Sequence, residues 1–352
     1  MVAGKMLNNN FWKNKKVLIT GNTGFKGSWL TILLLEKKAK IIGISKKEKR
    51  GLYLFNYLKL NNKIKQYYLD ICDYEKLKKV VKIEKPDVIF HLAAQPIVRE
   101  SYIRPLDTLK INIFGTSNIL EIIRYSKKKV SFINVTTDKV YKQSGVKSFS
   151  EAHSLGGKDI YSSSKASSDM ITSSYFESFF KKSKKIGIAT ARAGNVIGGF
   201  DWSNNRIVPD TVKASFNAKI LTIRMPKSIR PWQHVLDVVN GYVILAEKLY
   251  KDPIKFSGSW NFGPNNSANK NVITLVKTLR KELSKKAKVV FKKGNFHEEK
   301  SIKLLSIKSK KRLNWTPKFN FNKCIKLTAE IYNLYYKKIL NYEDFKKQTK
   351  LL

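Results

Sequence analysis

The chain has few cysteines and no long apolar run. Its two cysteines, Cys72 and Cys324, form neither a metal-ligand spacing nor a disulfide framework, which fits a reducing compartment. No stretch approaches the roughly 18 to 20 apolar residues of a membrane-spanning helix. Residues 1–16 lack the apolar core of a secretory signal. These absences exclude a disulfide scaffold, a zinc fold and a membrane span, and we expect a cytoplasmic protein with no metal site.

Acidic residues are also scarce. Twenty-six Asp and Glu face 69 Lys and Arg, which gives a formal charge of +43. The lysines are spread from Lys5 to Lys350, with no basic tail or stripe. A surface that tracks nucleic-acid phosphates favours arginine and clustering. The excess therefore indicates a compositional bias without a specific nucleic-acid partner, although weak attraction to polyanions stays open.

A glycine-rich turn lies close to the N-terminus. The apolar run Val17–Ile19 predicts a buried strand, and the apolar run 29–35 predicts a helix directly after the glycines. Glycine permits a tight turn and close approach of the backbone to a pyrophosphate, which a helix N-terminus also attracts. The context favours a dinucleotide site over a turn without ligand. The predicted cofactor contacts in this turn are Gly21, Thr23, Gly24, Phe25, Lys26 and Gly27.

Strand and helix signals alternate through the first half of the chain. Further strands are expected at 39–44, 64–69, 88–92, 130–135 and 186–192. This alternation predicts an α/β fold, a Rossmann-type doubly wound parallel sheet. Residues 1–193 would form the dinucleotide-binding domain, with returning elements near 235–264. Residues 194–352 would form a mainly substrate-binding lid domain, interleaved with the first. They begin with a loop over 195–209 and include a helix over 271–283.

The ends of three strands supply further cofactor candidates. The second strand ends in Ser45 followed by two lysines, where a carboxylate commonly holds the adenosine ribose. Ser45 can bond a ribose hydroxyl and the lysines a 2′-phosphate, so the residues leave NAD and NADP both open. Asp70 and Ile71 suit a clamp on adenine, with a turn or helix-cap aspartate as the alternative. Leu92, Ala93 and Ala94 leave room for a ligand at the fourth strand end.

Two polar residues next to these strand ends invite different interpretations. His91, within the fourth strand, is expected to be a hydrogen-bonded structural residue. Asn112 lies on an otherwise buried helix face, where its amide needs partners. We count Asn112 among the cofactor-binding candidates.

A tyrosine and a lysine form the chemical centre. Tyr161 and Lys165 are four residues apart and share one helix face. A nearby ammonium favours phenolate, so the pair predicts a tyrosine pKa lowered toward neutrality and a general base for a hydroxyl proton. Lys165 can also hold the nicotinamide ribose. Thr137, Asp138 and Lys139 follow the fifth strand.

Several stretches together resemble one family. The chain is similar to the extended short-chain dehydrogenases/reductases of the NAD-dependent epimerase/dehydratase family, most closely the CDP-glucose 4,6-dehydratases. GFKGSW and RPWQHV are the most specific motifs. The matching stretches are 21–30, 90–102, 134–141, 161–165, 191–202, 206–210, 229–237 and 260–264, with weaker similarity at 297–299 and 313–317.

The resemblance implies NAD as a tightly bound cofactor and a closed redox cycle. Tyr161 would remove the 4-hydroxyl proton of CDP-glucose as C4 is oxidised, water would leave across C5–C6, and the hydride would return to C6. By position, Thr137 would bond the 4-oxygen and Asp138 would be the acid for the 6-hydroxyl. Lys139 stands where related dTDP-glucose dehydratases carry a glutamate base, and it can act so only if burial or cations lower its pKa. The product would serve cell-surface deoxysugar (O-antigen) synthesis.

The resemblance also implies a set of substrate-binding residues. Arg206 and Arg230 suit the diphosphate, because a guanidinium fork matches phosphate oxygens. Trp202 and Trp232 can pack on the sugar or base, or equally in the core. The substrate-binding candidates are Gln95, Asn195, Trp202, Arg206, Arg230 and His234.

Two further expectations concern assembly and the competing functions. Family members commonly pair through two helices beside the active site, so we expect a homodimer or homotetramer. The alternatives are a UDP- or dTDP-sugar dehydratase or epimerase, and a catalytically silent nucleotide- or polyanion-binding relative.

Overall fold

The computed structural model describes residues 10–47, 51–143, 145, 148–223, 225–291 and 303–352. Its centre is a seven-stranded sheet of order β12-β7-β5-β4-β1-β2-β3, and every neighbouring pair in it is parallel. The strands are β1 (Lys16–Thr20), β2 (Lys40–Ser45), β3 (Lys65–Tyr68), β4 (Val88–His91), β5 (Val130–Val135), β7 (Ile186–Ala193) and β12 (Gly258–Phe262). The expected doubly wound parallel sheet is confirmed.

The direction of winding reverses beside β1. From β1 the chain adds β2 and β3 on one side, then crosses to place β4, β5 and β7 on the other. Ligands of such sheets bind at this switch point, outside the carboxyl ends of the strands. The glycine turn that follows β1 therefore lies where a dinucleotide is expected.

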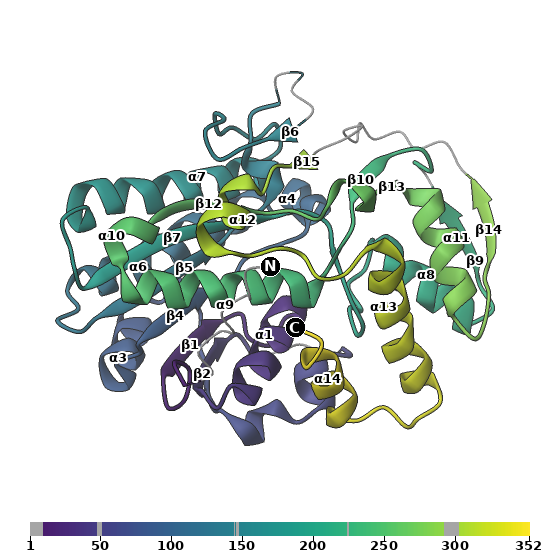
Figure 1. The fold of residues 1–352 in the computed structure, drawn as a ribbon, viewed down its shortest axis with the longest axis horizontal. Helices are drawn as coiled ribbons and strands as arrows, with labels where there is room; N and C mark the ends of the chain where they lie inside the picture. Colours follow the sequence, from purple (N-terminus) through teal and green to yellow (C-terminus); the bar gives the residue numbers. More distant parts are fainter. Residues whose placement is uncertain (1–9, 48–50, 144, 146–147, 224, 292–302) are drawn as a thin grey trace, which may run out of the picture.

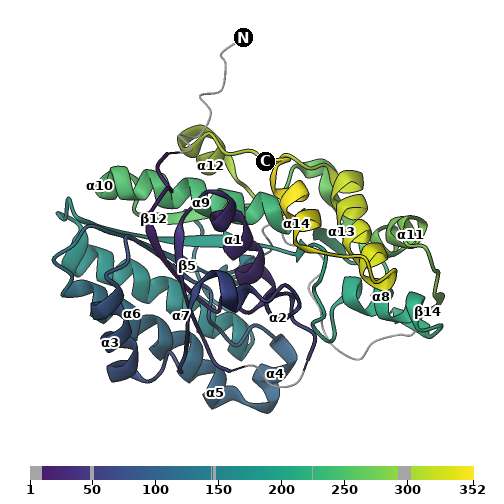
Figure 2. The same cartoon turned by 90° about the horizontal axis from the view of Figure 1, so that it is seen from below.

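Helices cover both faces of the sheet (Figure 2). One face carries α1 (Phe25–Glu36), α9 (Val235–Lys251), α10 (Pro253–Phe256) and α12 (Ile307–Leu313). The other carries α3 (Tyr74–Glu84), α4 (Val98–Ile103), α5 (Pro105–Leu109), α6 (Gly115–Arg124) and α7 (Ile160–Tyr175). The remaining helices of the sheet-bearing part are α2 (Leu54–Tyr57) and α14 (Tyr342–Thr349), both near α1.

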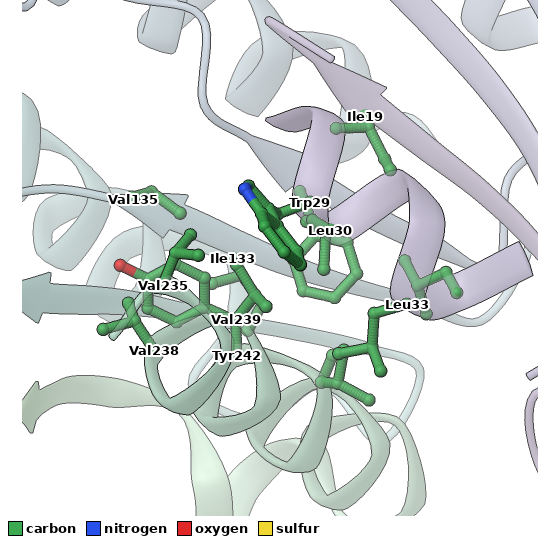
Figure 3. Packing of buried hydrophobic residues seen from close by; sticks show 14 of the residues in the cluster. Ile19, Trp29, Leu30, Leu33, Ile133, Val135, Val235, Val238, Val239 and Tyr242 are labelled. Atoms are coloured by element: carbon green, nitrogen blue, oxygen red, sulfur yellow. The ribbon is translucent and has the colours of Figure 1, made fainter. Parts of the chain in front are cut away.

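Helix α1 is buried because the sheet, helix α9 and helix α14 surround it. Trp29 and Leu30 face the side chains of α9 and of strand β5, among them Val239 and Ile133 (Figure 3). Helix α14 packs on α1 as well, and Phe345 lies against Trp29 with ring centroids 5.1 Å apart. A helix that is apolar all round needs such a surrounding. Each fully buried large side chain here contributes roughly 1.5–3 kcal/mol.

A second core lies at the other end of the molecule (Figure 1). Helix α8 begins at Ile207, so the loop predicted over 195–209 ends earlier, at Arg206. Pro209 lies in the first turn of that helix, where the missing N–H has no partner to lose. The elements of this end are β8 (Val196–Ile197), α8 (Ile207–Phe216), β9 (Ile220–Ile223), β10 (Ile229–Pro231), β11 (Gln233–His234), β13 (Asn269–Asn271), α11 (Val272–Glu282), β14 (Lys288–Phe291) and α13 (Phe321–Tyr336).

Two short strands complete the structure: β6 (Ser148–Phe149) pairs with β15 (Lys303–Leu304). The weak similarity noted at 297–299 lies outside the described residues. In the part of the chain that the structure covers, no helix combines the length and the apolar character that a bilayer crossing requires.

Candidate active site

The glycine turn has the shape of a phosphate cradle. Gly21 has φ +70°, and a Cβ there would lie 2.7 Å from the backbone nitrogen of Ala93. A Cβ on Gly27 would lie 2.2 Å from the carbonyl oxygen of Gly21. Gly24 is the N-cap of α1 without a side-chain cap, and the first turn holds no acidic residue. Free N–H donors at a positive dipole end suit an anion, so the turn fits a dinucleotide pyrophosphate.

A polar chain crosses the expected adenosine end. The Asn22 amide donates to Gln66 Oε1 at 2.7 Å, and Gln66 Nε2 donates to Ser45 Oγ at 3.2 Å. Asn22 Oδ1 is buried and has no hydrogen-bond partner among the described residues. Asn22 and Gln66 are not among the residues singled out from the sequence. The position of Gln66, a polar residue within the third predicted strand, could have indicated it.

Asp70 makes the contacts of a turn aspartate. Its Oδ1 accepts the Cys72 N–H at 2.9 Å, and its Oδ2 pairs with Lys46 Nζ at 2.7 Å. The N-cap of α3 is instead Asp73. Ile71 is buried against Gly115. The lysine expected near a 2′-phosphate is therefore held by Asp70.

His91 is structural. Its Nδ1 lies 2.8 Å from Thr20 Oγ1 and its Nε2 lies 3.1 Å from Thr116 Oγ1. Burial, with a smaller contribution from Lys165, lowers the His91 pKa to about 3. The imidazole is neutral and links β1, β4 and α6.

Asn112 connects the β4 strand end to the tyrosine helix. Its Oδ1 accepts the Gln95 N–H at 2.8 Å, and its Nδ2 donates to Ser164 Oγ at 2.8 Å. The Gln95 side chain is hydrogen-bonded within the protein: its Oε1 accepts the Ile97 N–H, and its Nε2 donates to Thr108 Oγ1. Gln95, expected at the substrate, is used here to hold the backbone beyond β4.

Thr137, Asp138 and Tyr161 converge. Thr137 caps the 3₁₀ turn Asp138–Val140, and its hydroxyl donates to Asp138 Oδ1 at 2.9 Å. The same Thr137 side chain lies close enough to the Tyr161 phenol to lower the pKa of that phenol. Tyr161 lies in the first turn of α7, whose N-cap Asp159 accepts the Ser162 N–H at 2.9 Å. The structure thus joins a phenol, a hydroxyl and a carboxyl from two elements.

The expected lowering of the Tyr161 pKa is wrong for the ligand-free chain. Burial raises the pKa of Tyr161 to about 12, against the opposing effects of Arg206 and Thr137. Lys165 provides only part of the expected charge at neutral pH, because burial, with the nearby Lys26, lowers its own pKa to about 7. Its Nζ donates to the Val135 carbonyl at 2.9 Å. Desolvation outweighs the charge effect that spacing alone predicts.

Asp138 has the properties of an acid. Burial raises its pKa, although Lys139, Thr137 and Arg230 oppose the shift. A buried carboxyl with a raised pKa retains its proton at higher pH than an exposed one and can donate it.

Of the two lysines near Asp138, Lys139 is exposed and Lys26 is desolvated. Lys139 therefore does not meet the burial condition set for a base in the ligand-free chain. Burial, followed by the charge of Arg206, lowers the Lys26 pKa to about 8, and Asp138 opposes the shift. Lys26 thus lies within electrostatic range of the acid as well as in the cofactor turn.

The predicted substrate-binding residues Arg206, Arg230 and Asn195 have different contacts in the structure. Arg206 acts on the pKa of Tyr161, with its Nη1 3.7 Å from Asp201 Oδ2, and Arg230 acts on the pKa of Asp138. Arg206 therefore lies within electrostatic range of Tyr161, and Arg230 within range of Asp138. The Asn195 carbonyl accepts the Gln233 N–H at 3.1 Å, which pairs the loop with β11.

Of three other candidates from the same region, Trp232 and His234 are buried and Trp202 is half-buried. Trp202 lies in an aromatic cluster, with its ring 5.2 Å from that of Tyr332, and Trp232 is buried in the second core. His234 has no exposed surface; it caps α9 through Leu236 N–H and lies 6.0 Å from the Trp29 ring. Its pKa falls to about 3 because of burial. A ligand cannot reach His234 without rearrangement, so the expected substrate contact has no support in its position.

Comparisons with known proteins agree with this geometry. The sequence model of a family described as GDP-mannose 4,6 dehydratase matches residues 18–328. The CDP-glucose 4,6-dehydratase of Salmonella typhimurium is 37% identical over 326 residues, which covers 91% of each chain. The dTDP-D-glucose 4,6-dehydratase of Mus musculus is 27% identical over 348 residues, covering 96% of this chain and 92% of that one.

Solved structures share the fold. The dTDP-glucose 4,6-dehydratase of Bacillus anthracis, in complex with NAD, superposes with a TM-score of 0.76 at 23% identity, over 93% of this chain and all of that one. The UDP-glucuronic acid 4-epimerase of Bacillus cereus, with UDP-glucuronic acid and NAD, gives 0.78 at 24% identity, over 91% and 100%.

Proposed function

The chain belongs to the GDP-mannose 4,6-dehydratase family, and from that premise we propose that it converts CDP-glucose to CDP-4-keto-6-deoxyglucose as a hydro-lyase with bound NAD. The substrate is taken from the Salmonella relative. The observation that carries the proposal is the contact of Tyr161 with Thr137, whose hydroxyl also bonds Asp138. An epimerase does not need the acid in that group, because it removes no water.

The cofactor would lie along the glycine turn, with Gly21, Gly24 and Gly27 leaving room for its pyrophosphate and the β4 end for its nicotinamide half. Bound there, it would accept the C4 hydride and return it at C6. Lys165 would hold the adjoining ribose. This places the oxidised carbon next to Tyr161.

The protein side chains divide the proton steps among them. Tyr161 takes the proton of the 4-hydroxyl while Thr137 bonds the same oxygen. The 4-ketone then acidifies the C5 proton, and Asp138 gives its proton to the departing 6-hydroxyl. Burial raises the pKa of Asp138, which supports this role.

We assign to Lys139 both the removal of the C5 proton and, after exchange with solvent, the return of a proton to C5 when the hydride reaches C6, with one condition. Its side chain is exposed in the ligand-free chain, so the bound sugar has to desolvate it. Lys26 is the alternative base, because burial already lowers its pKa to about 8.

Arg206 and Arg230 are proposed to hold the substrate diphosphate. Each influences the pKa of a different catalytic residue, Tyr161 or Asp138, so both lie within electrostatic range of the cluster. Residues 194–352 would supply most of the substrate side, and residues 1–193 the cofactor side.

The experiment is an incubation of the purified protein with CDP-glucose in deuterated water. The proposal expects a sugar product lighter by one water, with solvent deuterium at C5. Parallel incubations with UDP-, dTDP- and GDP-sugars test base selectivity. An unchanged mass with inverted stereochemistry would point to an epimerase, and no reaction with any sugar would point to a silent binder. Heat release of the cofactor separates NAD from NADP.

We also propose that the protein forms a homodimer and acts in the cytoplasm, in cell-surface deoxysugar synthesis. The support for pairing is a set of exposed apolar side chains on packed neighbouring helices, α4, α5, α7 and the segment entering α6. They are Tyr102, Ile103, Leu106, Phe114 and Met170. Exposed apolar side chains gathered on neighbouring helices are typical of a protein interface.

A further inference from the structure

A buried ion pair joins the tyrosine helix to the sheet. Asp169 lies four residues after Lys165 and eight after Tyr161, so all three share one face of α7. Arg192 of β7 reaches both oxygens of this carboxylate, with Nη2 2.7 Å from Oδ1 and Nε 2.9 Å from Oδ2. The two side chains are only 3% and 1% exposed. A bidentate pair of this kind fixes orientation as well as distance.

The same pair holds both ends of the catalytic turn. Before the turn, Thr136 Oγ1 donates to Asp169 Oδ2 at 2.9 Å. After the turn, Arg192 Nη1 donates to the Tyr141 oxygen at 2.8 Å. The residues between, 137–140, carry the hydroxyl and the acid that act on the sugar. Both ends of the segment are therefore tied to one rigid charge pair.

The pair is itself anchored to the edge of the sheet. Arg192 Nη2 donates to Ser259 Oγ at 2.8 Å, and Tyr141 donates to Asn261 Oδ1 at 2.7 Å. Both acceptors belong to β12, the strand paired with β7 (Figure 1). The Asn261 amide in turn donates to the Phe149 carbonyl at 3.0 Å. The network thus spans β5, β7, β12 and α7.

We propose that Asp169 and Arg192 are positioning residues that set the distance between Tyr161 on α7 and the Thr137–Asp138 segment after β5. The inference rests on the proposed function in taking those three residues as the groups that act on the sugar. Asp169 fixes where α7 lies along the sheet, and its partners fix where the turn begins and ends. Because a displacement of about 1 Å can slow a reaction about 100-fold, such a link affects turnover more than binding.

The sharpest test removes single hydroxyls and leaves the ion pair intact. Thr136→Val and Tyr141→Phe each cut one link between the pair and the catalytic turn. Thr190→Val is the matched control, because Thr190 Oγ1 also donates to Asp169, at 3.1 Å, but lies on β7 away from the turn. Thr136→Ser restores the lost hydroxyl.

We expect Thr136→Val and Tyr141→Phe to lower kcat about tenfold with little change in KM, and Thr136→Ser to recover it. Thr190→Val should keep kcat, with a similar loss of thermal stability. Equal losses of kcat in all three variants, or none in the first two, would overturn the proposal.

A second measurement does not depend on turnover. In the ligand-free protein with ring-labelled tyrosine, the Tyr161 signal should shift in Thr136→Val and Tyr141→Phe and stay in place in Thr190→Val. If the wild-type protein dehydrates no sugar nucleotide but these shifts occur, the proposed function fails and the positioning link stands. If the protein is active and the Tyr161 signal does not move, the positioning proposal fails alone.

Discussion

Two buried side chains of the site, Tyr161 and Lys165, and the half-buried Lys26 have pKa values displaced by desolvation toward their neutral forms. In the ligand-free chain the phenol keeps its proton at neutral pH, while Lys165 is close to its midpoint. A ligand that brings charge or excludes water changes this balance. The protonation of these groups therefore depends on what binds next to them.

Lys165 should give the ligand-free protein a distinctive pH dependence of stability. Its pKa is about 7 in the folded chain, against 10.5 for an ordinary solvated lysine, so the unfolded chain binds the proton more tightly. Stability from this group should rise with pH between about 7 and 10, by about 1.4 kcal/mol per pH unit. Lys165→Met should remove that rise. Urea unfolding between about pH 7 and 9.5 measures it, with the exposed Lys181→Met as the control; parallel curves for wild type and Lys165→Met would contradict the folded pKa.

Lys26 is expected to matter most for the cofactor. A cation in the first turn of α1 opposes the helix dipole, so Lys26→Met should stabilise the ligand-free protein by about 0.3–1 kcal/mol. The same change should weaken NAD binding about tenfold by removing a phosphate partner. Calorimetric titration with NAD measures the second effect, and Lys40→Met, at the exposed start of β2, is the control. Unchanged NAD affinity with a loss of C5 exchange would instead make Lys26 the base.

Lys139 is expected to act after C4 oxidation. Lys139→Met should still reduce the bound nicotinamide in a single turnover but lose elimination about 100-fold, as general-base variants do. Near-ultraviolet absorbance follows the first step, and deuterium entry at C5 follows the second. If Lys139→Met exchanges the C5 proton at the wild-type rate, Lys139 has no role as the base.

At the scale of elements, the N-terminus of α7 determines whether the phenol reaches the catalytic turn. Asp159 accepts from both the backbone and the hydroxyl of Ser162, at 2.9 and 2.7 Å. This cap fixes the start of the helix two residues before Tyr161. The second end of the molecule has an equivalent cap, because Asn271 accepts the Thr274 N–H at 2.8 Å at the start of α11.

These two caps allow a matched comparison. Asp159→Ala and Asn271→Ala should each destabilise the protein by about 1 kcal/mol, the usual effect of losing an N-cap. Only Asp159→Ala should also lower kcat, because it frays the turn that carries Tyr161. Thermal unfolding of both variants measures the loss of stability, and steady-state kinetics measures the change in kcat. An equal effect of the two substitutions on kcat would mean that the start of α7 does not position the phenol.

At the scale of the whole molecule, the helices beside the active site leave apolar side chains in solvent. Met170 is 47% exposed on α7, and Leu106 is 79% exposed on the neighbouring α5. The proposed dimer would cover this surface and with it the outer side of the tyrosine helix. Assembly and catalysis would then share one element.

Leu106→Glu and Met170→Glu should convert the dimer to a monomer, because a charge in an apolar interface loses its hydration. Light scattering after size-exclusion chromatography measures the mass. Ile220→Glu is the control, since Ile220 is 61% exposed on β9 at the other end of the molecule. A wild-type protein that is already monomeric at micromolar concentration would refute the dimer.

Local patterns were sufficient for the strands of the sheet, whereas the catalytic roles that they suggest for Tyr161 and Lys165 stay predictions. Gly21 and Gly27 are predictable because the absence of a Cβ is a property of the residue itself. Tyr161 and Lys165 are predictable as neighbours because helical spacing places them on one face. The spacing of Tyr161 and Lys165 is local, whereas the close approach that requires Gly21 is to the backbone of the distant Ala93.

Only the tertiary structure decided the electrostatics and the burial of the individual side chains. Sequence could not show that Lys139 is exposed and Lys26 desolvated, or that His234 and Trp232 pack inside the protein. Nor could it pair Asp169 with Arg192, which lie on different elements. Burial, pKa and ion pairing depend on which segments, distant in the sequence, contact each other in the fold. A local sequence pattern does not determine those long-range contacts.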